Sequence, residues 1–145
     1  MTSVFGVRLA FAAAIAVLTM AFTPAEAGVV VHINKSSQRM AVSVDGAMRY
    51  SWPVSTGRHG YGTPSGVFRP QMMVRRWYSR KYYNSPMPHS IFFYGGFAIH
   101  GTYELGRLGG PASHGCVRLH PSHAAMLYAL VERNGRGSTR IEITN

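Results

Sequence analysis

The stretch Ser113-His114-Gly115-Cys116-Val117-Arg118-Leu119 places a thiol, an imidazole and a guanidinium in one short run, and the rest of the chain is best interpreted outward from it. Cys116–Leu119 is largely apolar, which predicts a short strand that starts at the thiol. Gly115 precedes the thiol at a point where a side chain would crowd a close approach to a substrate. A turn here can aim successive backbone N–H groups at one position, as an oxyanion requires.

A second histidine lies at the end of another apolar run. Phe97–Gly101 predicts a short strand that carries His100 near its end, and the loop Thr102–Ser113 connects it to the thiol segment. If the two strands lie side by side, the imidazole comes close to the sulfur of Cys116. A nearby imidazole lowers the pKa of a thiol and moves its proton, which prepares a nucleophile.

The residues alone leave three interpretations of Cys116 open. It is the single cysteine of the chain, so it cannot form a disulfide within the chain. It is therefore a buried inert side chain, a cysteine paired with another chain, or a reactive thiol. His100, His114 and Cys116 are also zinc-ligand types, although their spacing contains no paired-ligand motif.

Several motifs taken together resemble the L,D-transpeptidase catalytic domain, the YkuD family. They span residues 29–143, and the most specific is the run around Cys116 with a His-Gly pair upstream. In chain order the matching segments are Val54–Gly57, Thr63–Gly66, Pro86–Pro88, Phe92-Phe93, His100–Thr102, Leu108–Ala112 and Ser113–Leu119.

The resemblance implies a catalytic role for five residues. Cys116 would be the nucleophile and His100 the general base, with the backbone carbonyl of Gly101 as the third member. The backbone N–H groups of His114, Gly115 and Cys116 would bind the oxyanion, each worth about 2.7–4 kcal/mol at the transition state.

Four further residues receive supporting roles: those of Ser113, Arg118 and His89 come from the resemblance, and that of Tyr83 from its place among the tyrosines of the long loop. Ser113 would hydrogen-bond within the site, and Arg118 would hold its strand or meet a substrate carboxylate. His89 would line the cleft, with simple packing as the alternative. Tyr83 would belong to a lid or stacking wall formed by the tyrosines of residues 77–89, again with packing as the alternative. The resemblance implies no metal and no organic cofactor.

The rest of the chain predicts a mainly β fold. Asp45-Gly46 is a strong hairpin signal, residues 55–66 indicate turns, and residues 77–89 indicate a long surface loop. One helix is expected from Pro121 to Arg133. The resemblance implies a single β-sandwich-like L,D-transpeptidase domain with one or two short helices. The other expected strands are Val29–Ile33, Arg39–Val44, Ala47–Val54, Val67–Arg76, Ile91–Tyr94 and Arg140–Thr144.

Residues 1–27 have the layout of a secretory signal peptide. Arg8 precedes the apolar run Leu9–Phe22, and Ala25-Glu26-Ala27 gives a small-x-small cleavage pattern. An uncleaved membrane anchor is the alternative, but the run is short for a bilayer span. We therefore expect an exported, periplasmic or envelope protein whose catalytic domain is residues 28–145, with membrane contact only through the leader before cleavage.

The charge of the chain favours an anionic partner. The formal net charge is +10, and removing the leader takes away Arg8 and Glu26, one charge of each sign, so it stays +10. The remaining acids are too few for a carboxylate-rich metal site or a glycosidase acid pair. The arginines are scattered rather than gathered on a recognition helix, which argues against nucleic acid.

The resemblance therefore predicts an enzyme of peptidoglycan synthesis and cell-wall organisation. Its thiolate would attack a tetrapeptide stem, expel D-alanine and pass the acyl group to an amine on another stem, on an envelope protein or on a D-amino acid. Water as acceptor would make it an L,D-carboxypeptidase. The alternative from a different class is an exported basic wall-binding module without turnover.

Overall fold

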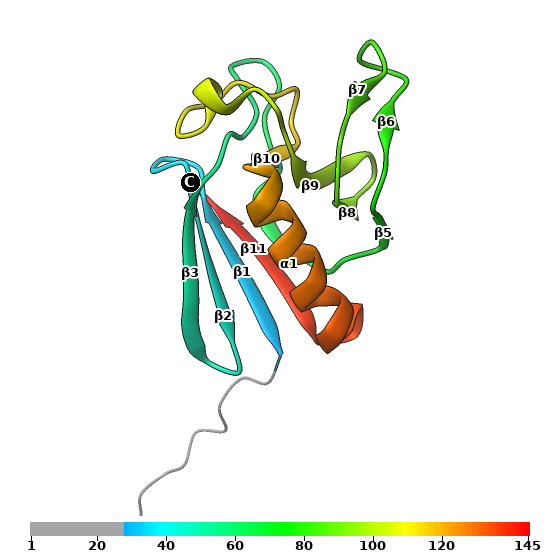
Figure 1. Cartoon of the computed structure of the whole chain (residues 1–145). Coiled ribbons are helices and arrows are strands. Elements are labelled where there is room, and N and C mark those ends of the chain that lie inside the picture. Colours follow the sequence, from blue (N-terminus) through cyan, green and yellow to red (C-terminus); the bar gives the residue numbers. More distant parts are fainter. Residues whose placement is uncertain (1–27) are drawn as a thin grey trace, which may run out of the picture.

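The computed structural model describes residues 28–145 (Figure 1). The expected signal peptide, residues 1–27, lies outside the described residues. Two sheets and one long helix share a single hydrophobic core, so the fold is mainly β, as predicted. Within residues 28–145, no helix is both long and apolar enough to cross a bilayer.

The larger sheet has the strand order β3-β2-β1-β11-β4. β1 (Val29–Asn34) pairs antiparallel with β2 (Arg39–Val44) and parallel with β11 (Thr139–Thr144), so the first and last strands of the domain lie side by side. Buried and half-buried residues alternate along β1, which is why one face enters the core. β3 (Ala47–Pro53) forms an edge strand and β4 (Gly66–Phe68) the other.

The hairpin between β2 and β3 is confirmed at its predicted turn. Asp45 and Gly46 both have positive φ, 50° and 80°, as a tight two-residue hairpin turn requires. The Asp45 Oδ1 also accepts a hydrogen bond from the Gly28 N–H at 2.8 Å, which fixes the start of the described chain against this turn.

The smaller sheet has the order β10-β9-β8-β5 and carries the sequence motif described above. Its members are β5 (Met72–Val74), β8 (Ser90–Tyr94), β9 (Phe97–Gly101) and β10 (Val117–Leu119). β9 and β10 are parallel neighbours, which confirms the predicted pairing of these two strands. The helix α1 (Pro121–Asn134) packs on β9 and also contacts β1 and β8.

The helix forms where it was predicted. His120 caps its first turn by accepting a hydrogen bond from the Ser122 N–H at 3.2 Å, and Pro121 occupies the start, where no backbone donor is needed. The side chains that it buries are the predicted apolar stripe, namely Ala124, Leu127, Tyr128, Leu130 and Val131.

Two expectations about strands are wrong. Residues 67–76 do not form one strand but two, β4 and β5, which belong to different sheets. The break falls at Pro70, which has no N–H to donate to a sheet. Residues 77–89 are not simply a loop, because β6 (Tyr78–Ser79) and β7 (Ser85–Pro86) pair as a small antiparallel hairpin. Two short 3-10 helices, Leu105–Arg107 and Arg136–Ser138, complete the fold.

Candidate active site

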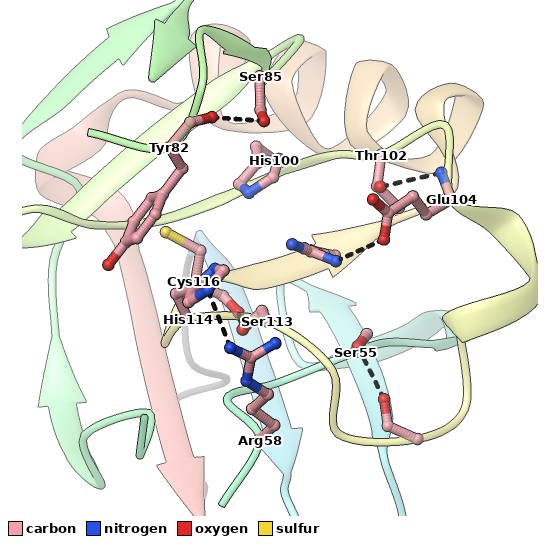
Figure 2. Close-up of polar contacts among 12 residues, drawn as sticks. Ser55, Arg58, Tyr82, Ser85, His100, Thr102, Glu104, Ser113, His114 and Cys116 are labelled. Atoms are coloured by element: carbon pink, nitrogen blue, oxygen red, sulfur yellow. Dashed lines mark hydrogen bonds and ion pairs between the residues drawn. The ribbon is translucent and has the colours of Figure 1, made fainter. Parts of the chain in front are cut away.

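The strands β9 and β10 sort their side chains onto two faces. Arg118 lies opposite His100 in the parallel register, and Val117 lies opposite Ile99. Ile99 and Val117 are buried in the main core. Because side chains alternate along a strand, His100 and Cys116 emerge on the other face, where the β6–β7 hairpin lies above them (Figure 2).

The imidazole of His100 is buried and oriented by the backbone. Its Nδ1 lies 2.7 Å from the Gly101 carbonyl oxygen. A carbonyl oxygen only accepts, so Nδ1 carries the proton and Nε2 is left as a base. Burial lowers the pKa of His100 to about 4, although the bond to Gly101 opposes the shift, and the charge of Arg118 lowers it further. The residue is therefore a neutral imidazole at neutral pH.

The thiol of Cys116 is half-buried, and it is protonated in this arrangement. Burial raises the pKa of Cys116, while the Ala98 backbone and the Arg118 charge act to lower it. The sulfur donates a long hydrogen bond to the Gly96 carbonyl oxygen at 3.9 Å. Burial outweighs these two effects, and His100, whose imidazole is neutral, is not among the groups that lower the pKa of Cys116.

The turn before the thiol is held by Ser113. Its hydroxyl donates to the Cys116 carbonyl oxygen at 2.5 Å and accepts from the Gly115 N–H at 3.0 Å. The Gly115 N–H is therefore already occupied, unlike the expectation that it binds an oxyanion. Within residues 28–145, the N–H groups of His114 and Cys116 have no hydrogen-bond acceptor, so these two are the available donors.

Thr63 supports this turn, a role that was not predicted from the sequence. Its hydroxyl donates to the Gly115 carbonyl oxygen at 2.7 Å and accepts from the Gly57 N–H at 2.9 Å. Thr63 is buried. The segment of residues 55–66 is thus a brace for the thiol turn rather than a set of free turns. A Thr-Pro-Ser-Gly run within a Gly-rich segment was the signal that could have found it.

His114 lies between two tyrosines and an arginine. Tyr82 stacks on its ring at 4.2 Å, and Tyr61 approaches edge-on at 4.8 Å. The Nε2 of His114 accepts from the Arg58 guanidinium at 3.2 Å, as Figure 2 shows, because arginine only donates. Partial burial and the neighbouring cations, first among them Arg58, lower the pKa of His114. This neutral ring orients the site and is not free to act as its base.

Two cavities meet at Cys116. A cleft of about 820 Å³ runs beneath the hairpin beside Trp77, Arg80 and Phe97. A smaller cavity of about 310 Å³ lies on the side of His100 and Glu104. Cys116 and His114 line both, as do Ser79, Tyr82 and Met87. The sulfur is therefore reached from two directions.

The three expected substrate-binding residues differ in whether they line a cavity beside Cys116. Arg118 lines the smaller cavity, pairs with the Glu104 carboxylate at 3.1 Å, and exchanges backbone hydrogen bonds with Ser55. Tyr83 lines the same cavity from the hairpin tip and is fully exposed. His89 lines neither cavity and packs edge-on against Tyr128 at 5.4 Å, so the packing alternative holds for it.

The zinc alternative has no support in the geometry. In the described part of the chain, no three or more His, Cys, Asp or Glu side chains gather where they could hold a metal ion. The Nδ1 of His100 and the Nε2 of His114 are each engaged with protein groups.

Comparison with known proteins assigns the fold to a family. The family model of the L,D-transpeptidase catalytic domain, YkuD, matches residues 28–143. The chain belongs to this family. A search of curated proteins found no match.

Solved structures of L,D-transpeptidases share the fold of this YkuD domain. The L,D-transpeptidase from Mycobacterium smegmatis is 24% identical with a TM-score of 0.73, over 82% of this chain and 59% of that one. The enzyme from Stackebrandtia nassauensis is 26% identical with a TM-score of 0.72, over 88% and 62%. L,D-transpeptidase 3 from Mycobacterium tuberculosis, in complex with a faropenem-derived adduct, is 20% identical with a TM-score of 0.70, over 81% and 60%. The chain thus spans about three fifths of the length of these relatives.

Proposed function

We propose that this YkuD domain is a cysteine-dependent L,D-transpeptidase that acts on peptidoglycan tetrapeptide stems in the cell envelope. The observation that carries the proposal is the placement of Cys116 and His100 on the same face of paired strands, both lining one cavity. The backbone bond from His100 to Gly101 leaves Nε2 as the base, without any carboxylate. Family membership supplies the reaction class, and the basic charge of the chain suits an anionic envelope.

The first half-reaction forms an acyl-enzyme on Cys116. The sulfur attacks the carbonyl carbon of the L-centre as its proton passes to Nε2 of His100. The carbonyl oxygen becomes an oxyanion that the N–H groups of His114 and Cys116 stabilise. The C–N bond then breaks, His100 returns the proton to the leaving nitrogen, and D-alanine departs. Because both groups are neutral at rest, the thiolate forms during attack rather than before it.

The second half-reaction transfers the acyl group to an amine. The two cavities that meet at Cys116 suit this chemistry, because the acyl chain can stay in one while the acceptor enters through the other. The acceptor is an amine of another stem or of an envelope protein. When water takes its place, the reaction becomes that of a carboxypeptidase.

The test uses residues 28–145 and purified tetrapeptide muropeptides, with products identified by mass spectrometry. We expect the domain to release D-alanine and form a joined product, and we expect Cys116→Ala to do neither. His100→Gln should also be inactive, whereas His59→Gln, a matched change in an exposed loop, should keep full activity. Release of D-alanine without joining would indicate a carboxypeptidase or a missing protein acceptor.

Acylation by a carbapenem tests the nucleophile separately. The thiol should open the β-lactam of imipenem, so the protein gains the whole mass of the drug and peptide mapping places it on Cys116. Another L,D-transpeptidase with the same fold, LdtMt1, has been solved in complex with imipenem, which makes this drug the natural probe. An adduct on any other residue, or equal adduct on Cys116→Ala, contradicts the assignment. No turnover and no adduct would favour a wall-binding module.

A further inference from the structure

The two cavities beside Cys116 differ in charge. The larger one is lined by three cations, Arg76, Arg80 and Lys81, and by no acidic residue. The smaller one is lined by Arg118 and by Glu104, and in residues 28–145 no other Asp or Glu borders either cavity. A positively charged molecule is therefore repelled on one side of the sulfur and not on the other.

Glu104 is the outermost charge of the smaller cavity. Its side chain is 67% exposed, whereas that of Arg118, its ion-pair partner, is 17% exposed. Only Oε2 contacts Arg118, at 3.1 Å (Figure 2), so Oε1 is available to a further donor. The backbone N–H of Glu104 is bound by the Thr102 hydroxyl at 3.1 Å, which holds the residue at the cavity rim.

We propose that Glu104 binds the ammonium group of the acyl acceptor and so directs the amine to Cys116 through the smaller cavity. The inference rests on the proposed transpeptidase function and deepens it. Arg76, Arg80 and Lys81 exclude the same ammonium from the larger cavity, which leaves that side to the acyl donor and its carboxylate. Arg118 holds the Glu104 carboxylate in place through their ion pair.

The transfer step conserves protons and electrons. The bound ammonium first loses one proton to solvent. The amine lone pair then attacks the thioester carbonyl carbon, and a second proton passes from nitrogen to Nε2 of His100. The C–S bond breaks with its electrons on sulfur, and His100 returns that proton to Cys116. The products are the new amide, the free thiol and one released proton.

The experiment measures how the acyl-enzyme partitions between amine and water. Residues 28–145 are supplied with tetrapeptide muropeptide as donor and with D-alanine amide, an ammonium without a carboxylate, as acceptor. We expect Glu104→Gln to lower the ratio of joined to hydrolysed product about tenfold, the size of one charge-assisted hydrogen bond. Glu104→Asp should recover most of this ratio, because it keeps the charge.

Two controls separate acceptor binding from a structural role. Glu132→Gln removes another exposed, ion-paired carboxylate, that of the Arg75 pair, and should leave the ratio unchanged. Hydroxylamine is an uncharged nucleophile at neutral pH, so its share of the acyl group should be the same in Glu104→Gln and in the unaltered domain. The first-turnover release of D-alanine, measured without any amine acceptor, reports the donor half-reaction and should also stay the same.

Each other outcome overturns the inference. An unchanged amine ratio in Glu104→Gln means that the carboxylate does not bind the acceptor. A parallel loss with hydroxylamine, or a slower first-turnover release of D-alanine without acceptor, means that Glu104 acts only by holding Arg118. If the unaltered domain releases no D-alanine, the proposed function itself fails and this inference falls with it.

Discussion

Gly115 meets two separate constraints in the turn that carries the nucleophile. Its φ is +121°, and a Cβ at this position would lie 2.5 Å from Cε1 of Phe97. We expect Gly115→Ala to lower the free energy of unfolding by about 2–4 kcal/mol, since strain and overpacking each cost about 1–3 kcal/mol. Acylation by imipenem should slow as the turn shifts. Urea denaturation and adduct kinetics measure the two effects.

A second glycine with a positive φ serves as a control that distinguishes backbone strain from the steric contact with Phe97. Gly135, at the C-terminal end of α1, also has a positive φ, +90°, but a Cβ there meets nothing within 4 Å. Gly135→Ala should therefore show the strain alone and leave acylation intact. Adding Phe97→Leu to Gly115→Ala should recover part of the lost stability. If Gly135→Ala is as damaging as Gly115→Ala, the contact with Phe97 plays no part.

The protonation of His100 sets the acid limit of the reaction. Its pKa lies at about 4, below the ordinary value of 6.5, because burial disfavours the imidazolium. Above that pH the imidazole is neutral and can accept a proton. As the pH falls through the pKa, the ring becomes protonated and can no longer act as a base. We expect kcat/KM for acylation to keep its plateau at pH 5 and to decline near pH 4. A decline centred near pH 6.5 instead would show that the ring is hydrated in solution.

At the scale of elements, the thiol turn depends on the brace of residues 55–66. Thr63→Val keeps the shape of the side chain but removes its hydroxyl, which leaves the Gly57 N–H and the Gly115 carbonyl without this partner. Each buried group left unpaired costs about 1–3 kcal/mol. We expect a lower midpoint in urea and slower acylation. Thr63→Ser retains the hydroxyl and should recover most of both; equal behaviour of the two variants would contradict the brace.

The β6–β7 hairpin is expected to act on substrate binding rather than on chemistry. Tyr82 stacks on His114 at 4.2 Å and lines both cavities. Tyr82→Ala removes the ring that lines both cavities and should raise KM for the muropeptide with little change in kcat. Tyr82→Phe keeps the ring and should resemble the unaltered domain. A fall in kcat alone would assign Tyr82 to the reaction itself.

Local patterns in the sequence predicted several elements and the pairing of the strands β9 and β10, but they did not predict the contacts between distant segments. Alternation and turn residues predicted β1, β2, β3 and α1, because these patterns are local. Thr63, which binds the Gly115 carbonyl oxygen, and Tyr82, which stacks on His114, are both far away from these residues in the chain. The position of His89 could not be predicted from the sequence either. Its ring packs against Tyr128, away from the cavities, and this contact is tertiary. The pKa of the Cys116 thiol also depends on tertiary structure, because burial raises it.

At the scale of the whole molecule, the histidines make the domain sensitive to acid. Four of them have a pKa lowered by burial and by nearby cations, namely His89, His100, His114 and His123. Groups with a lowered pKa in the folded state bind more protons when unfolded, so stability is complete above pH 6.5 and falls as the pH drops toward 4. His100 alone contributes roughly 3 kcal/mol to this fall, from a shift between 6.5 and about 4.

Urea denaturation of residues 28–145 at pH 7, 5.5 and 4.5 measures this linkage. The free energy of unfolding should decrease at each step, and the decrease should be smaller in His100→Asn, which cannot take up the proton. The comparison uses the difference between pH values, so the lower stability of the variant at pH 7 does not enter. His59→Asn, an exposed histidine, should follow the unaltered domain. If His100→Asn loses as much stability between pH 7 and 4.5 as the unaltered domain, burial does not lower the pKa of His100, and the loss of stability in acid comes from other groups.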